Sequence, residues 1–137
     1  MATGFTRARA SAILAGQIKS TTYVALSTTT PSVTGGNFTE PPTSAGYVRK
    51  AIGVLDTSIT AQVANKDYVF IFEALSDCGQ ITHVGLSDSL SRGSEVFLMG
   101  ELANPINVGK GYVPLIRPWK LKVGLDKAAL EAYPNET

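Results

Sequence analysis

The side chains that could perform acid–base or nucleophilic chemistry are few. His83 is the single histidine of the chain, and Ser87 and Asp88 follow it closely, so the residue types of a hydrolytic triad occur together. The surrounding pattern predicts a β-strand, however, and a strand would hold these side chains several ångströms apart and partly on opposite faces. We therefore expect His83 to be a hydrogen-bonded structural residue.

Acidic and sulfur-bearing side chains are too dispersed to predict a site. Asp77, Asp88 and Glu101 lack the spacing of a calcium loop, and the single cysteine, Cys78, cannot bind a metal alone. A glycosidase needs two carboxylates across a cleft, and Glu73 and Glu101 could serve only if the predicted strands that carry them faced each other. We expect a protein without enzymatic activity, metal or cofactor.

The composition indicates a single domain that binds other proteins. A chain of 137 residues matches one ordinary domain, so we treat 1–137 as one. Charged residues make up 17%, below the usual share of about 25%, which suggests that part of the surface faces protein and not water. The formal net charge of +1 argues against nucleic-acid binding, and no apolar run approaches the length that spans a bilayer. We expect neither nucleic-acid nor membrane partners.

Helical patterns occur near both ends of the chain. From Phe5 to Ile18 apolar residues, including Ile13 and Ile18, recur on one face, and Thr6 is placed to cap the first turn. The narrow apolar stripe of this 1–20 arm suits packing across a sheet or against a neighbouring protein. A second short helix, predicted from Asp126 to Tyr133, belongs to a tail that spans 126–137.

Between these ends the patterns are those of β-strands, with a hairpin connection at Asp88 to Ser94. No helix long enough for a crossover separates the strands, which excludes parallel βαβ architecture. We expect a mainly β fold, either an antiparallel β-sandwich of jelly-roll-like type or a barrel, with short N- and C-terminal helices. The predicted strands are Thr21 to Ser27, Tyr47 to Leu55, Ser58 to Ala64, Tyr68 to Glu73, Ile81 to Ser87, Glu95 to Leu102 and Ile106 to Val108. The last strands run from Tyr112 to Leu125, with an edge or a bend at Pro114 and Pro118.

Two of these strands should supply much of the core. The strand from Tyr68 to Glu73 is apolar on both faces, so it is the best candidate for the central strand, with Phe70 buried. Among the last strands, Trp119 begins a clean alternation of apolar and polar residues, which predicts that Trp119 is buried as well. Asn104-Pro105 predicts a turn.

A long irregular segment, 28–46, is rich in Thr, Pro and Gly and favours no regular element. Loops of this length inside a compact domain are uncommon and are usually functional or disordered. Phe38 lies in its middle and needs something to pack against, either its own domain or a neighbouring subunit. The residues that we consider as partner contacts are Phe38, Pro41, Pro42, Ile13 and Ile18.

Three stretches of the chain carry a resemblance to a known family. They are Tyr23 to Thr28 with Glu40-Pro41 and Gly46 to Lys50, Ile81 to Leu86 with Gly93, and Gly100 to Pro105 with Ile106 to Gly111. In this order and spacing they resemble small virion structural proteins of tailed bacteriophages, commonly labelled tail-fibre or minor structural proteins. The resemblance implies a β-sandwich, assembly on a virus particle and no enzymatic activity.

The resemblance leaves the place on the particle open. We favour head decoration, in which a cement protein clamps capsid subunits, because the chain lacks the long stalk or repeats of a fibre that reaches for a host. The alternatives are a tail-fibre or baseplate component and a carbohydrate-binding β-sandwich module, for which Trp119, Tyr112 and Tyr47 are the candidate aromatic residues. For a virion protein we expect capsid or tail subunits as partners, homo-oligomerisation, and a location in the virion after assembly in the cytoplasm of the bacterial host.

Overall fold

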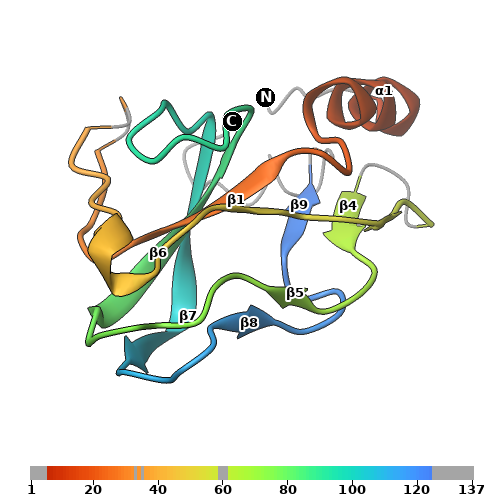
Figure 1. Cartoon of the computed structure of the whole chain (residues 1–137). Helices are drawn as coiled ribbons and strands as arrows, with labels where there is room; N and C mark the ends of the chain where they lie inside the picture. Colours follow the sequence, from red (N-terminus) through yellow and green to blue (C-terminus); the bar gives the residue numbers. More distant parts are fainter. Residues whose placement is uncertain (1–5, 33, 35, 59–61, 125–137) are drawn as a thin grey trace. The chain divides into compact units, whose positions relative to one another are not determined.

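The computed structural model of the chain describes residues 6–32, 34, 36–58 and 62–124. It divides into two compact units, which are described separately (Figure 1). Unit 1 contains the described parts of 1–20, 53–68 and 117–137, and unit 2 contains those of 21–52 and 69–116. The chain is mainly β and its strand pairs are antiparallel, which confirms the predicted fold class. The treatment of 1–137 as one domain stays a prediction.

Unit 2 is built on a four-stranded sheet with the order β2-β1-β6-β7. Strands β1 and β6 pair along the whole length of β1, from Tyr23 opposite Ser87 to Ser27 opposite His83. Val24 and Leu86, directly opposite each other, are completely buried at the centre of this pair. The elements of unit 2 are β1 (Tyr23–Ser27), η1 (Thr43–Ala45), β2 (Lys50–Ala51), β5 (Val69–Phe70), β6 (Gly79–Ser87), β7 (Leu98–Val108) and β8 (Leu115–Ile116).

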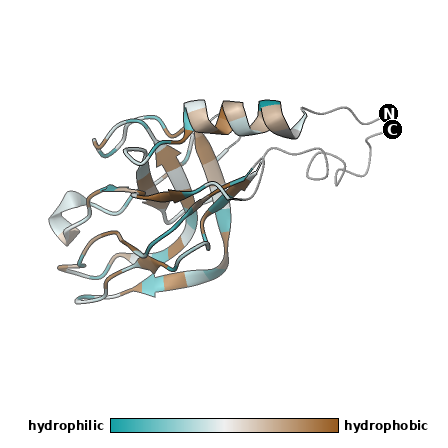
Figure 2. Cartoon of the chain, turned by 90° about the vertical axis from the view of Figure 1, so that its right-hand side faces the viewer, coloured by the Kyte–Doolittle hydropathy of each residue, from teal (hydrophilic) through white to brown (hydrophobic). Residues whose placement is uncertain are grey.

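Unit 1 combines helix α1 (Arg7–Gln17) with a three-stranded sheet of β3 (Leu55–Asp56), β4 (Gln62–Asn65) and β9 (Lys122–Gly124) in the order β3-β4-β9. The predicted N-cap is confirmed, because the Thr6 hydroxyl accepts a hydrogen bond from the Arg9 N–H at 3.3 Å. Leu14 and Ile18 are buried, and α1 contacts β4 and β9. Figure 2 shows hydrophobic and hydrophilic residues interspersed along α1.

The prediction that Tyr68 to Glu73 forms the central core strand is wrong. Only Val69 and Phe70 are in a strand, β5, and β5 pairs with β8 alone. A two-stranded ribbon buries one face, so Val69 and Ile71 point inward while Phe70 is 55% exposed. Phe72 follows the end of the strand and is buried, with its ring edge-on to the Tyr47 ring at a centroid distance of 5.2 Å.

The prediction that Trp119 is a core residue is also wrong. The segment Tyr112 to Leu125 contains two separate short strands, β8 and β9, with a turn at Pro118 and Trp119 between them. Proline cannot donate to a strand ladder, which favours a break at this point. Trp119 adopts a positive φ of 62° in the turn and its side chain is 51% exposed.

Asn104 and Pro105 lie inside strand β7, where a turn was predicted. Ile106 pairs with Ile81 and Glu101 with His83, so the residues between them form a bulge in β7. Strand β7 is at the edge of its sheet, where a proline without an N–H donor is tolerated. The predicted helix from Asp126 to Tyr133 and part of the predicted strand from Ser58 to Ala64 lie outside the described residues.

Candidate binding surfaces

A buried ion pair lies at the base of the long 28–46 segment in unit 2. The Arg49 guanidinium donates from Nε to Glu40 Oε1 at 2.8 Å and from Nη2 to Glu40 Oε2 at 3.1 Å, and both side chains are almost completely buried. The Tyr47 hydroxyl also donates to Glu40 Oε1, at 2.6 Å, and accepts the Leu26 N–H of strand β1 at 3.1 Å. The carboxylate is therefore connected to the central sheet.

The surroundings of Glu40 decide its charge. Burial raises the pKa of its carboxyl group, but hydrogen bonds from Arg49, Tyr47 and the Gly93 N–H outweigh burial, so the pKa lies below its ordinary value. The pKa of the Tyr47 hydroxyl group is raised instead, because the group is buried and donates its hydrogen bond to the Glu40 carboxylate. Glu40 is therefore an anion and Tyr47 a neutral donor at physiological pH.

The ion pair joins the 28–46 segment to the β6–β7 connection. Arg49 donates to the carbonyl groups of Ser89 and Ser94 in that connection, at 2.9 and 2.6 Å. In return, Arg92 donates to the carbonyl groups of Pro41 and Glu40, at 2.7 and 2.6 Å. The long segment is thus attached to the β6–β7 connection of its own unit through Glu40 and Pro41, near its C-terminal end. Sequence reasoning missed this pair, although Glu40 and Arg49 both lie in the motifs that carry the family resemblance.

The five predicted partner-contact residues occupy different environments. Ile18 and Pro41 are buried, Ile13 is partly exposed, and Pro42 is exposed. The ring of Phe38 packs against Gly85 of strand β6 so closely that a Cβ at Gly85 would lie 3.0 Å from it. Phe38 therefore contacts its own domain, the first of the two alternatives. Contact of these residues with a partner protein stays a prediction.

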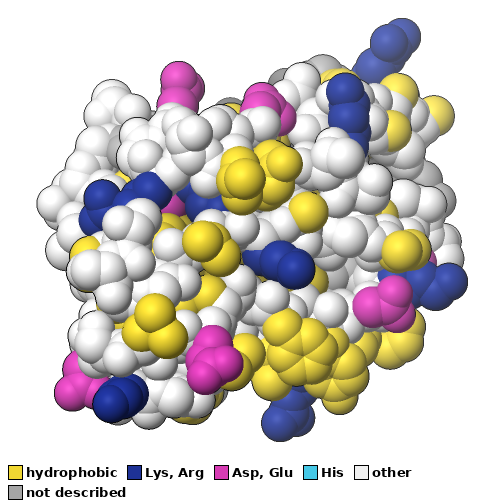
Figure 3. Space-filling model, in the orientation of Figure 1, with side chains coloured by type: hydrophobic (Ala, Val, Ile, Leu, Met, Phe, Trp, Pro, Cys, Tyr) yellow, Lys and Arg dark blue, Asp and Glu magenta, His cyan; other side chains and the backbone are white. Residues whose placement is uncertain are grey.

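The β5–β8 ribbon presents apolar side chains to solvent. Phe70 and Leu115 lie directly opposite each other in the register, so their side chains share one face. Phe70 is 55% exposed and Leu115 38% exposed, and Val113 beside them is 36% exposed. Figure 3 shows hydrophobic side chains gathered over this part of the surface. We call Phe70, Val113 and Leu115 the apolar ribbon.

Two of the residues considered for chemistry, His83 and Cys78, make local hydrogen bonds. His83 is buried, and its Nδ1 lies 2.8 Å from the Thr82 hydroxyl, with which it forms a hydrogen bond. Within the described residues no group of three or more His, Cys, Asp and Glu side chains could hold a metal ion. Burial and the nearby Asp77 carboxylate raise the pKa of the Cys78 thiol, so this thiol is not an activated nucleophile. Among the residues that the structure describes, no helix has the length and hydrophobicity needed to cross a membrane.

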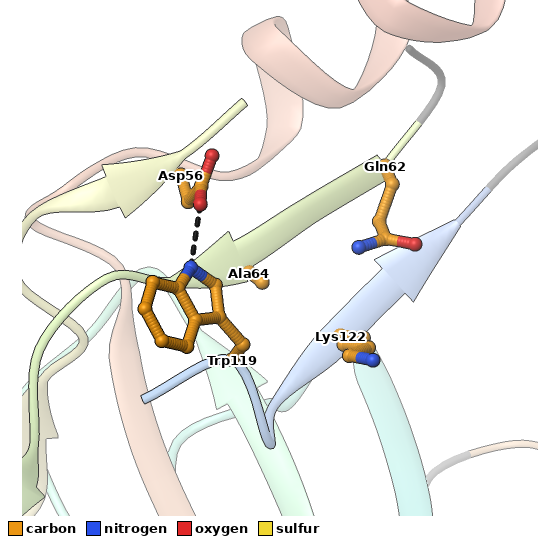
Figure 4. A pocket seen from close by; sticks show the side chains of 5 residues that line it. All are labelled: Asp56, Gln62, Ala64, Trp119 and Lys122. Carbon is orange, nitrogen blue, oxygen red and sulfur yellow. Dashed lines mark hydrogen bonds between the residues drawn. The ribbon is translucent and has the colours of Figure 1, made fainter. Parts of the chain in front are cut away.

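Unit 1 carries a surface hollow of about 300 Å³ beside Trp119 (Figure 4). Its lining consists of Asp56, Gln62, Ala64, Trp119 and Lys122. Figure 4 shows the Trp119 indole on one side of the hollow and the Gln62 amide on the other, with Ala64 between them. The indole N–H donates to the Asp56 carboxylate. The sequence offered no signal for this set, because its members come from three strands and a turn.

A family model matches residues 11–124 of the chain, and the family is described as the podophage GP4 fiber I protein gp80. No curated protein matches the chain. The match confirms the predicted resemblance to tailed-bacteriophage virion structural proteins. Because it covers most of the chain, the chain belongs to the Gp80 family of phage fibre proteins.

Proposed function

We propose that this chain, a member of the Gp80 family, is a non-enzymatic structural component of a tail fibre on a tailed-phage particle. The family match carries the proposal, and it favours the tail-fibre alternative over the head decoration that we preferred from the sequence. The partners are then other virion proteins, and the chain is located in the virion after assembly in the bacterial cytoplasm.

The apolar ribbon is the surface that we assign to contact with those partners. Large apolar side chains on neighbouring positions of one surface are commonly found where proteins bind each other. The ribbon has this character, because Phe70 and Leu115 are paired on one face and both are well exposed. The partner is a neighbouring fibre subunit, either a second copy of this chain or another tail protein.

Cryo-electron microscopy of the particle that carries this chain tests the location. The expected result is density for the two units in a fibre attached to the tail. Density on the head lattice would contradict the proposal and return the chain to the decoration role.

A pair of substitutions tests the surface. Phe70→Ser and Leu115→Ser together should leave the chain folded, because both side chains are exposed, and should reduce its incorporation into particles at least about tenfold, which corresponds to the loss of a hot spot. Leu90→Ser is the matched control, since Leu90 is 55% exposed in the β6–β7 connection and outside the ribbon. Equal incorporation of all variants would show that the ribbon is not the contact surface.

A further inference from the structure

Trp119 has a backbone conformation that bulky residues rarely adopt. Its φ of 62° lies in the left-handed region, which is unfavourable for a side chain of this size. Despite this, about half of the Trp119 side chain is exposed to solvent, so burial of the ring does not explain the conformation. An unfavourable conformation that the fold maintains is a reason to look for a function at the residue.

Buried Asn65 holds the turn that carries Trp119. The Asn65 side chain donates to the carbonyl groups of Asp67 and Arg117, at 2.8 and 2.9 Å, and accepts the Leu121 N–H at 3.0 Å. Its backbone carbonyl accepts the Trp119 N–H at 2.8 Å. Because Asn65 is completely buried in strand β4, these bonds fix both ends of the turn to the sheet, and the indole N–H is held by its hydrogen bond to the Asp56 carboxylate.

The polar side chains beside the indole form a row across the sheet of unit 1. Asp56, Ala64 and Lys122 are direct neighbours in the register of β3, β4 and β9, and Gln62 lies two residues from Ala64 on the same face. Ala64 is small and buried, which leaves the hollow above it (Figure 4). Hydrogen bonds from Ser58 and from the Trp119 indole lower the pKa of Asp56, so this carboxylate is ionised and fixed.

We infer that the hollow beside Trp119 binds a neutral pyranose ring of a glycan. The indole offers a flat apolar face on which the C–H face of a sugar can stack. Gln62 can donate and accept hydrogen bonds, Lys122 donates and Asp56 accepts, which matches hydroxyl groups that do both. One anion and one cation balance each other, so the lining favours neither an acidic nor a basic ligand. The volume of about 300 Å³ is at the lower end for small-molecule sites and suits one sugar ring.

The biological setting of this site rests on the proposed fibre function, in which a glycan would be met outside the particle. The binding itself is a property of the chain and is measured without the particle. A chain found on the head could still bind the sugar, and a fibre protein could lack the site, so the two proposals fail separately.

Tryptophan fluorescence provides a direct test, because Trp119 is the sole tryptophan of the chain. The full chain is titrated with the methyl glycosides of glucose, galactose, mannose and N-acetylglucosamine, each up to about 100 mM, while the Trp119 emission is recorded. We expect a saturable change with at least one glycoside and a midpoint of about 1–10 mM, as for a single subsite. Absence of a saturable change with all four would overturn the inference.

Three variants locate the binding. Gln62→Ala should weaken it about tenfold, the effect of one hydrogen bond to the ligand. Trp119→Gly, which suits the positive φ, should abolish binding when the glycoside is followed by saturation-transfer NMR. Tyr112→Ala removes another exposed aromatic side chain, in unit 2, and should leave binding unchanged. Undiminished binding in Gln62→Ala and Trp119→Gly would place the sugar elsewhere. An emission that changes with protein concentration in the absence of sugar would instead assign the indole to a contact between chains.

Discussion

Two irregular segments of this chain are each held in place by buried polar side chains, which we call anchors, and the chemistry of the two anchors differs. The 28–46 segment of unit 2 is attached through the Glu40–Arg49 ion pair, whereas the turn of unit 1 that carries Trp119 is attached through neutral Asn65. In both cases the anchor satisfies backbone groups that would otherwise be left without partners. The ion pair depends on two charged residues and on pH, and the amide depends on neither.

The two anchors also differ in how many parts of the chain they connect. The ion pair joins three distant stretches, because Glu40, Arg49 and the β6–β7 connection each contribute donors or acceptors. Asn65 acts locally, on residue 67 and on residues 117 to 121, and holds the turn that carries one exposed ring. The Glu40–Arg49 pair therefore stabilises unit 2 as a whole, whereas Asn65 holds the turn from which the Trp119 side chain extends.

Removal of Arg49 should have the largest effect. Arg49→Met leaves the Glu40 carboxylate buried without its cation, and we expect the free energy of unfolding in urea to fall by about 3–5 kcal/mol. The double variant Glu40→Gln/Arg49→Met should lose less than the sum of its single variants, because no charge remains buried. Lys50→Met is the control, since Lys50 is an exposed cation one residue away and should change stability little. A loss under about 1 kcal/mol in Arg49→Met would mean that the ion pair does not anchor the segment.

Removal of the neutral anchor should have a smaller effect. Asn65→Ala leaves the Leu121 N–H and the Arg117 carbonyl without their partner, and we expect a loss of about 2–3 kcal/mol. The freed turn should also change the emission of Trp119 in the folded state. A loss of stability with unchanged Trp119 emission would mean that Asn65 stabilises the unit but does not hold the turn that carries Trp119.

The two anchors should also differ in their response to acid. The folded-state pKa of Glu40 is lowered, so its stabilising contribution is fully present above the unfolded value of about 4.5 and is lost as pH falls toward the folded value. Urea unfolding at a series of pH values should show a shallower acid decline for Glu40→Gln than for the parent chain. Asn65→Ala should reduce stability without changing the slope. Parallel curves for Glu40→Gln and the parent chain would contradict the assignment.

Replacement of Trp119 should have the smallest effect on folding. Trp119→Gly removes an exposed ring and its hydrogen bond to Asp56, and it also relieves the unfavourable backbone conformation. These effects oppose each other, so we expect stability to change by less than about 1 kcal/mol in thermal or urea unfolding. A loss above about 2 kcal/mol would make Trp119 a structural residue and weaken the case for a binding site.

Local signals in the sequence determined several features of this protein. The Thr6 cap acts on a donor three residues away, and the apolar spacing that leads to Leu14 and Ile18 is a property of a helix alone, so both were predictable. The pattern from Ile81 to Ser87 likewise identified strand β6, and the lack of crossover helices indicated the antiparallel class.

The tertiary structure decided which apolar residues are covered and which polar residues meet. Phe70 and Trp119 belong to apolar patterns, yet Phe70 lies in a ribbon with one covered face and Trp119 in a turn, so both are exposed. Glu40 and Arg49 meet because a loop folds back, and Asp56, Gln62 and Lys122 meet because three strands pair in one register. Hydropathy patterns describe single segments, whereas burial and side-chain contacts depend on the neighbours that each segment acquires on folding.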